Sequence, residues 1–135
     1  MLSTNLKGTI FTVQKALPLL TEGGSVILTA STVANKGLPG SSVYAATKAA
    51  IRALARSWIV DLAGRGIRIN VVSPGAIATP GLLGASPDAR AAQRRLEYIA
   101  SQTPLGRLGT ADEIGRVVTF LASGASSLIN GADIQ

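Results

Sequence analysis

Tyr44 and Lys48 are the two residues whose types and spacing most clearly suggest chemistry. They lie four positions apart at the start of a segment with helical periodicity, so their side chains project from the same helix face. An ammonium beside a phenol favours the phenolate, which lets the pair exchange a proton with a substrate oxygen near neutral pH. The spacing therefore predicts an acid/base pair, and the alternative interpretation is an ordinary exposed pair on a helix.

Further polar groups directly follow the predicted strands. Ser31 comes after an apolar run at 25–30, and the segment 74–80 comes after a second such run at 67–72. In parallel sheets, groups that contact ligands lie at the carboxyl ends of the strands. The glycine in the second segment permits close approach of the backbone to a ligand, and Thr79 adds a hydroxyl. Both segments are candidate parts of a site, and a helix cap or a simple turn is the alternative for each.

Hydrophobic periodicity and punctuation predict the elements that position these groups. Helices are expected at 4–20, 42–63 and 86–100 and from 110 onward, and strands at 25–30, 67–72 and the beginning of a third at 132–135. Pro18 predicts a kink or an early end of the first helix, and Ser86 with Pro87 predicts the start of the third. The spacing of Thr110 and Glu113 predicts a capping box. This alternation predicts an α/β fold with a parallel sheet and flanking helices.

Composition excludes several classes of site. The 135 residues include no Cys and no His, which excludes disulfides, Cys/His metal centres and a serine triad with a His base. We therefore expect no metal site. The net charge of +6 is concentrated in the first half of the chain, but the basic residues are scattered and only 4% of residues are aromatic. We therefore expect no nucleic-acid partner.

Hydropathy also bears on location. No apolar stretch approaches the length of a membrane span, and the first residues lack the basic start and apolar run of a signal peptide. We therefore expect no membrane partner and a cytoplasmic protein.

Taken together, the motifs resemble those of the short-chain dehydrogenases/reductases. The matching segments, in that family's order and spacing, are 5–8 (Asn-Leu-Lys-Gly), 24–27 (Gly-Ser-Val-Ile), 30–31 (Ala-Ser), 44–50 (Tyr-Ala-Ala-Thr-Lys-Ala-Ala), 66–75 (Gly-Ile-Arg-Ile-Asn-Val-Val-Ser-Pro-Gly), 79–80 (Thr-Pro), 104–107 (Pro-Leu-Gly-Arg) and 129–131 (Ile-Asn-Gly). The resemblance covers nearly the whole chain. It is strongest to the bacterial branch that includes β-ketoacyl carrier-protein reductases and sugar or alcohol dehydrogenases, and it implies a Rossmann-like, doubly wound parallel sheet.

The resemblance implies a role for each catalytic candidate. Tyr44 would donate a proton to a ketone or accept one from an alcohol, with Lys48 favouring its ionisation and holding the nicotinamide ribose. Ser31 would orient the substrate oxygen, and Asn5 would anchor the water that links Lys48 to solvent. The implied cofactor is NAD or NADP, and the implied substrate is a small carbonyl compound or alcohol.

The resemblance also implies binding residues. Those for the cofactor are Tyr44, Lys48, Pro74, Gly75, Ile77 and Thr79, and those for an apolar substrate pocket are Val33, Leu38, Ala76, Leu82 and Leu83. A segment at about 80–106 would form a mobile lid, and a surface helix is the alternative. Helices 4–20 and 42–63 would form the contact of a homo-oligomer.

The sequence departs from the family at its beginning. It has no Gly-rich turn between a strand and a helix, so we interpret 1–135 as a single partial dinucleotide-binding domain whose amino-terminal half is missing. We expect weak activity, an unpaired edge on the strand 25–30, and no basis for choosing between NAD and NADP. The alternative interpretation is a non-catalytic binding or oligomerisation module derived from such an enzyme.

Overall fold

The computed structural model describes residues 1–83 and 88–135, which fall into two compact units. The first unit comprises 1–74 and 118–135, and the second comprises 75–117. Within the described ranges, no helix combines the length and the hydrophobicity needed to cross a bilayer.

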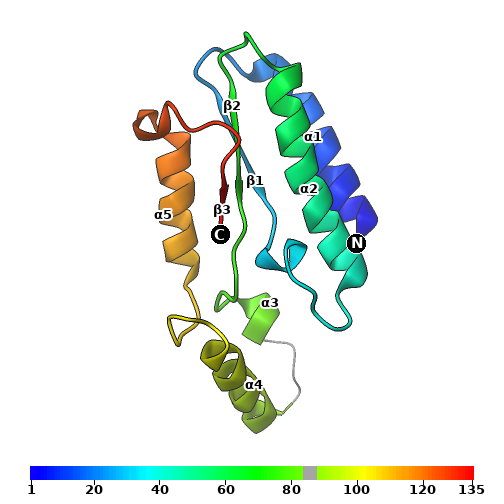
Figure 1. The fold of residues 1–135 in the computed structure, drawn as a ribbon, viewed down its shortest axis with the longest axis vertical. Coiled ribbons are helices and arrows are strands. Elements are labelled where there is room, and N and C mark those ends of the chain that lie inside the picture. Colours follow the sequence, from blue (N-terminus) through cyan, green and yellow to red (C-terminus); the bar gives the residue numbers. More distant parts are fainter. Residues whose placement is uncertain (84–87) are drawn as a thin grey trace. The chain divides into compact units, whose positions relative to one another are not determined.

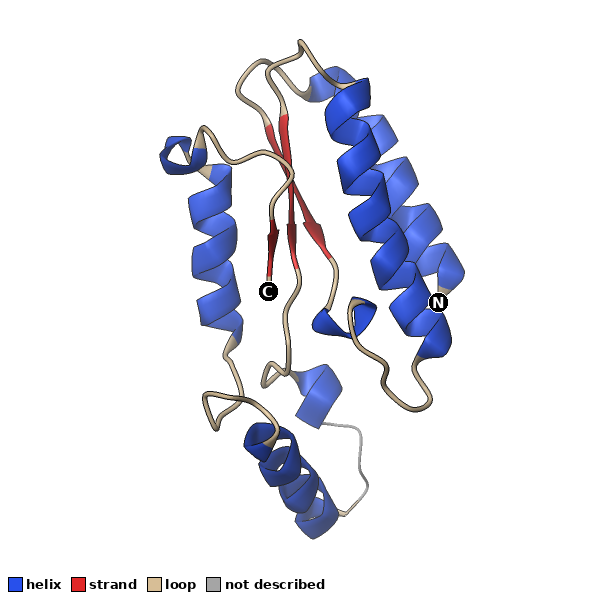
Figure 2. Ribbon diagram, in the orientation of Figure 1, coloured by secondary structure: helices blue, strands red, loops and turns tan. Residues whose placement is uncertain are grey.

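A three-stranded parallel sheet forms the centre of the first unit (Figures 1 and 2). Its strands are β1 (Ser25–Thr29), β2 (Arg68–Val72) and β3 (Asp133–Ile134), in the order β1-β2-β3. The register pairs Val26 with Ile69. No strand of the described residues pairs with the outer side of β1. The parallel α/β sheet and the unpaired edge of the first strand are therefore both confirmed.

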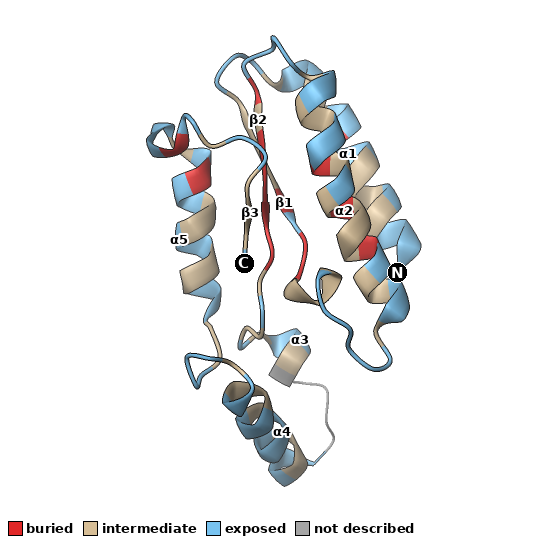
Figure 3. Cartoon of the chain, in the orientation of Figure 1, coloured by how far each residue is buried: buried red, intermediate tan, exposed pale blue. Residues whose placement is uncertain are grey.

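One face of this sheet carries the apolar core under α1 (Gly8–Ala16) and α2 (Ser42–Asp61). The buried members of the core, drawn in red in Figure 3, are Val13, Leu28, Ala30, Ile51, Ala55, Ile69 and Val71. Successive side chains of a strand point to opposite faces of the sheet, so every second residue of β1 and β2 packs against these helices. This packing fixes the position of α2 over the sheet.

The other face of the sheet is joined by hydrogen bonds to the segment 121–130. The Ser25 hydroxyl donates to the Leu121 carbonyl at 2.9 Å, and the Asn70 amide donates to the Ile129 carbonyl at 2.9 Å. Asn70 is fully buried, so these bonds satisfy polar groups that would otherwise destabilise the core. Leu121, at the end of α5 (Ala111–Ala122), is also fully buried, as the helical pattern predicts.

The first helical segment is less regular than its apolar pattern predicts. It begins with a π-helical turn at Ser3–Lys7, continues as α1, and ends in a 3-10 turn at Leu17–Leu19. Pro18 lies in that last turn, so the expected early end of the helix is confirmed. The π turn contains Asn5 and was not expected from the sequence.

The second unit contains α3 (Pro80–Leu83), α4 (Ala89–Ser101) and the beginning of α5. The cap expected at Ser86 is wrong for α4, because the Asp88 carboxylate accepts the N–H groups of Arg90 and Ala91 at 3.0 and 3.3 Å. Ser86 and Pro87 themselves lie outside the described residues.

The predicted capping box of α5 is confirmed. The Thr110 hydroxyl accepts the Glu113 N–H at 3.3 Å, and the Glu113 carboxylate accepts the Thr110 N–H at 2.8 Å. The guanidinium of Arg107 also donates to this carboxylate, and the bond lowers the pKa of Glu113 to about 2.

Candidate active site

Lys48 ties α2 to the carboxyl end of β1. Its ammonium donates to the Thr29 carbonyl at 2.8 Å, and Thr29 is the last residue of that strand. Partial burial lowers the pKa of Lys48 below its ordinary value, because desolvation disfavours the charged form. A weakly solvated cation therefore lies where the sequence places the candidate site.

Tyr44 shares a helix face with Lys48, as their spacing predicts. It lies half-buried in the first turn of α2, and the centroid of its ring is 5.8 Å from the Lys48 ammonium. Since Lys48 bonds the end of β1, this helix turn also lies near the end of that strand. The arrangement places a phenol, an ammonium and a strand end in one neighbourhood.

Ser31 follows β1 by two residues and is 9% exposed. Its hydroxyl oxygen accepts the Val33 N–H at 3.4 Å, so it caps the 3-10 turn Thr32–Ala34. The alternative role as a turn cap is therefore confirmed. The hydroxyl proton has no acceptor in the described part of the chain, which leaves an O–H donor for another oxygen.

Asn5 is held against α2 through Thr47. The Thr47 hydroxyl gives its single proton to the Tyr44 carbonyl at 2.7 Å and accepts from the Asn5 amide nitrogen at 3.2 Å. Thr47 is 1% exposed, so both bonds are shielded from water. Asn5 and Lys48 line the same groove, of about 610 Å³, between α1 and β1. Sequence reasoning missed Thr47, although it directly precedes Lys48.

An ion-pair network at the ends of β2 and β3 was also missed. One oxygen of Asp133 accepts the hydroxyl of the fully buried Ser73 at 2.5 Å, and the other lies 2.5 Å from the Arg52 guanidinium. The same guanidinium donates to Asn35, which ends the turn after Ser31. Arg52 lies one helix turn beyond Lys48, and this spacing indicates a shared helix face but not the partner on β3.

The candidates beyond Pro74 belong to the second unit. A parallel bridge pairs Ile77 with Gly109, in which Ala78 donates to Gly109 and Gly109 donates to Ala76. The Ile77 carbonyl accepts the Thr79 N–H at 2.8 Å, whereas the Ile77 N–H has no partner among the described residues. An orphan backbone donor fits the carboxamide oxygen of a nicotinamide.

The residues predicted for the substrate pocket are divided between the units. Val33 is half-buried and Leu38 is 54% exposed, both in the first unit. Ala76 and Leu82 are half-buried in the second unit, and the side chain of Leu83 lies outside the description. In the described ranges no group of three or more carboxylates is placed to hold a metal ion.

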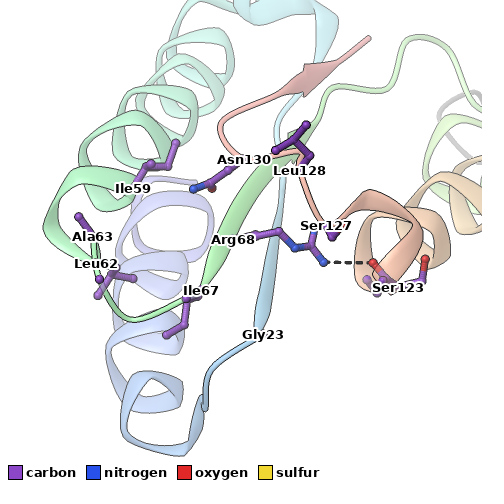
Figure 4. Close-up of a pocket in the computed structure, with 14 residues that line it drawn as sticks. Gly23, Ile59, Leu62, Ala63, Ile67, Arg68, Ser123, Ser127, Leu128 and Asn130 are labelled. Carbon is purple, nitrogen blue, oxygen red and sulfur yellow. Dashed lines mark hydrogen bonds between the residues drawn. The ribbon is translucent and has the colours of Figure 1, made fainter.

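A pocket of about 510 Å³ lies at the opposite, amino end of the sheet (Figure 4). Ile59, Leu62 and Leu128 line it, together with the Arg68 side chain. The Arg68 guanidinium donates to the Ser123 carbonyl at 3.2 Å and to the Ser126 hydroxyl at 2.9 Å. This cation is therefore committed to internal acceptors.

The sequence model of the family described as enoyl-(acyl carrier protein) reductase matches residues 1–135. An oxidoreductase of Sarocladium schorii is 48% identical over 134 residues, covering 98% of this chain and 52% of that protein. A 3-oxoacyl-[acyl-carrier-protein] reductase of Thermotoga maritima is 36% identical over 133 residues, covering 97% and 52%. The chain thus spans about half the length of the curated relatives it matches.

Solved structures share the fold. The ligand-free aldohexose dehydrogenase of Thermoplasma acidophilum superposes with a TM-score of 0.89 at 27% identity, covering 96% of this chain and 53% of that one. A short-chain dehydrogenase/reductase of Brucella melitensis, titled a glucose/ribitol dehydrogenase, gives a TM-score of 0.88 at 37% identity, covering 99% and 52%.

Proposed function

Because the chain belongs to the short-chain dehydrogenase/reductase family, we propose that it provides the site of an oxidoreductase that interconverts a ketone and a secondary alcohol with NAD or NADP. The observation that supports this most directly is the bond from Lys48 to Thr29. It brings the Tyr44–Lys48 pair to the strand end that continues into Ser31.

Each candidate side chain has a defined role in the proposed reaction. The free O–H of Ser31 donates to the substrate oxygen and orients it, and the Tyr44 phenol gives that oxygen its proton during reduction. The Lys48 ammonium assists ionisation of the phenol and holds the ribose hydroxyls. Asn5, fixed by Thr47, anchors a water beside Lys48 in the groove they share.

The segment 74–79 is proposed to hold the nicotinamide end of the cofactor. The unpaired Ile77 N–H fits the carboxamide oxygen, and the Thr79 hydroxyl adds a second polar group, with Pro74 and Gly75 preceding them. When bound, the nicotinamide supplies or takes the hydride. Titration with NADH and with NADPH distinguishes the two cofactors.

The substrate is proposed to be a small carbonyl compound or alcohol bound among apolar side chains. Val33, Leu38, Ala76, Leu82 and Leu83 would supply them. The segment 80–106, which contains α3 and α4, is proposed as a lid over this site. The names of the relatives refer to a 3-oxoacyl group on a carrier protein in one case and to an aldohexose in another.

A fluorescence titration tests this proposal. The purified chain is titrated with NADH and with NADPH up to about 1 mM, the affinity range of a weak complex. We expect saturable enhancement with one of them and at least a tenfold weaker affinity in Lys48→Met, because a charge-assisted bond is lost. Lys15→Met removes an exposed cation of α1 and serves as the matched control, with affinity unchanged. The absence of saturation with both cofactors contradicts the proposal.

A role as an assembly module is a second candidate, favoured by exposed apolar side chains on the outer helices. Phe11 is 48% exposed on α1, and Val43 and Val60 are 53% and 73% exposed on α2. Large exposed apolar groups favour association. We therefore also propose a homo-oligomer through helices 4–20 and 42–63.

Analytical ultracentrifugation tests the assembly proposal. The double variant Phe11→Glu/Val60→Glu is expected to dissociate the oligomer, because it places two charges in the apolar contact. Leu128→Glu is the matched control, since Leu128 is 97% exposed in a turn outside these helices. A monomeric native chain, or an equal effect of the control, contradicts this interface.

A further inference from the structure

Ser31 and Tyr44 belong to different elements, although the proposed reaction needs both at one substrate oxygen. Ser31 lies in the segment that follows β1, whereas Tyr44 lies in the first turn of α2. A misplacement of about 1 Å between reacting groups is enough to lower a rate about 100-fold. Contacts that fix the Ser31 segment against α2 therefore bear directly on the reaction.

Two hydrogen bonds from α2 hold the segment that contains Ser31. At the start of this segment, the Lys48 ammonium donates to the Thr29 carbonyl at 2.8 Å. At its end, the Arg52 guanidinium donates to the side-chain oxygen of Asn35. Lys48 and Arg52 are one helix turn apart, so a single face of α2 is bonded to both ends of the segment.

A single tight turn joins Asn35 to Ser31. The Asn35 N–H donates to the Thr32 carbonyl, and the Ala34 N–H donates to the Ser31 carbonyl, both at 3.0 Å. The Ser31 hydroxyl also accepts the Val33 N–H at 3.4 Å. Because these bonds leave the turn few alternative conformations, a displacement of Asn35 is passed on to Ser31.

Arg52 is itself held by β3. Its Nε atom lies 2.5 Å from one carboxylate oxygen of Asp133, and the other oxygen accepts the hydroxyl of the fully buried Ser73 at 2.5 Å. The side chains of the ion pair are only about one-fifth exposed, so water competes weakly for these bonds. A continuous chain of polar contacts therefore runs from the ends of β2 and β3 through Arg52 to the turn after β1.

A guanidinium suits this position because it presents several N–H donors in a fixed planar fork. Its Nε serves Asp133, while one of its terminal nitrogens serves Asn35. A lysine ammonium is a compact point charge, and at this position it would keep the charge-assisted contact to Asp133 in preference to the neutral amide. The ion pair and the contact to the turn can therefore be separated by substitution.

We propose that Arg52 is a positioning residue, which holds the turn after β1 so that the Ser31 hydroxyl and the Tyr44 phenol meet at one substrate oxygen. The guanidinium acts through Asn35 and needs no contact with the substrate. The effect on catalysis rests on the proposed function, whereas the holding of the turn does not.

Steady-state kinetics of Asn35 variants test the proposal. Asn35→Ala removes the acceptor and is expected to lower kcat for the reduction of ethyl acetoacetate about tenfold, with cofactor affinity unchanged. Asn35→Asp keeps a side-chain oxygen for the guanidinium and is expected to restore kcat to within about twofold of the native value. Because Asn35 is exposed, both variants should melt within about 3 °C of the native chain. A native kcat in Asn35→Ala, or equal losses in the two variants, overturns the proposal.

Arg52→Lys tests the guanidinium itself. It is expected to keep most of the stability through Asp133 and yet to lower kcat about tenfold, because the contact to Asn35 is lost. Arg56→Lys, at an exposed position one helix turn further along α2, is the matched control and is expected to leave kcat unchanged. The double variant Asn35→Ala/Arg52→Lys should be no more than about twofold slower than either single variant, since both remove one contact. Losses that multiply, or an equal loss in Arg56→Lys, contradict the assignment.

Amide hydrogen exchange separates this inference from the proposed function. The Ala34 N–H is expected to exchange at least about fivefold faster in Asn35→Ala than in the native chain, and at the native rate in Asn35→Asp. The Val71 N–H, which donates to the Ala132 carbonyl, reports that the sheet is intact. Faster exchange of Ala34 in a chain that reduces no ketone contradicts the proposed function and leaves the holding of the turn established. Unchanged exchange in Asn35→Ala overturns the inference, whether or not the chain is active.

Discussion

The two ends of the sheet in the first unit differ in how they use their charged side chains. At the amino end, the Arg68 guanidinium is bonded to a carbonyl and a hydroxyl of the segment 123–126. At the carboxyl end, Lys48 is bonded to one strand carbonyl, and the Ser31 hydroxyl proton has no acceptor among residues 1–83 and 88–135. The amino end is closed by its own hydrogen bonds, whereas the carboxyl end holds groups that can still act on a ligand.

Polar groups at the carboxyl end of the sheet do more than destabilise the fold. The carboxyl end also contains a committed network, in which Asp133 joins Ser73 to Arg52. This network holds the strand ends and α2 in place, and the uncommitted groups lie beside it. Proton transfer requires a few free hydrogen-bond donors held in a rigid environment.

The largest predicted effect is loss of activity at the carboxyl end. Tyr44→Phe removes the phenol hydroxyl and is expected to lower the rate of ketone reduction at least about 100-fold, since general acid–base catalysis contributes at least that factor. The rate is measured by cofactor absorbance with ethyl acetoacetate as the ketone. A rate within threefold of the native chain would remove Tyr44 from the mechanism.

Asp133→Asn is predicted to have the next largest effect, on stability. It leaves the Arg52 guanidinium without its carboxylate in a site where both side chains are about one-fifth exposed. We expect a loss of about 2 kcal/mol in the free energy of unfolding, measured by urea denaturation. Asp61→Asn, at an exposed position ending α2, is the control. Equal losses in the two variants would show that the network does not stabilise this end.

Arg68→Met sharpens the contrast between the two ends. It removes the bonds to Ser123 and Ser126, and we expect a loss of about 1 kcal/mol because the apolar part of the side chain is retained. Cofactor affinity, measured in the same titration as for Lys48→Met, is expected to stay unchanged. A parallel loss of affinity at native stability would contradict the assignment of the amino end as structural.

The smallest predicted effect lies outside the sheet, at the start of α5. The pKa of Glu113 is lowered to about 2, mainly by the bond from Arg107. Because its folded pKa is depressed, the stabilisation is present above the ordinary value of 4.5 and is lost as the pH falls through about 2. Thermal unfolding between pH 5 and 2 should therefore depend less steeply on pH in Glu113→Gln. Identical slopes would contradict the contribution of this contact.

The sequence predicts the regular elements well. The continuous apolar runs locate β1 and β2 to within one residue, although only β2 is buried along most of its length and β1 is largely half-buried. The cap of α4 was misplaced because Ser86 and Asp88 both suit a cap, and only the backbone decides between them. The π turn around Asn5 was missed because an apolar pattern does not reveal the hydrogen-bond register.

The candidate site was only partly predictable. The spacing of Tyr44 and Lys48 fixes their common face, which local helix geometry determines. The contact between Arg52 and Asp133 depends on how β3 meets α2, so no local pattern indicates it. The bond from Lys48 to Thr29 likewise joins residues 19 positions apart in the sequence, so no local pattern indicates it.

Transfer of a labelled hydride is the most direct test of the account. The chain is incubated with ethyl acetoacetate and NADH or NADPH carrying deuterium at both C4 positions, and the alcohol product is analysed by mass spectrometry. The account predicts one deuterium in the product alcohol with the native chain and a yield at least about 100-fold lower with Tyr44→Phe. Absence of deuterated alcohol from a folded chain saturated with cofactor, or an undiminished yield with Tyr44→Phe, would contradict it.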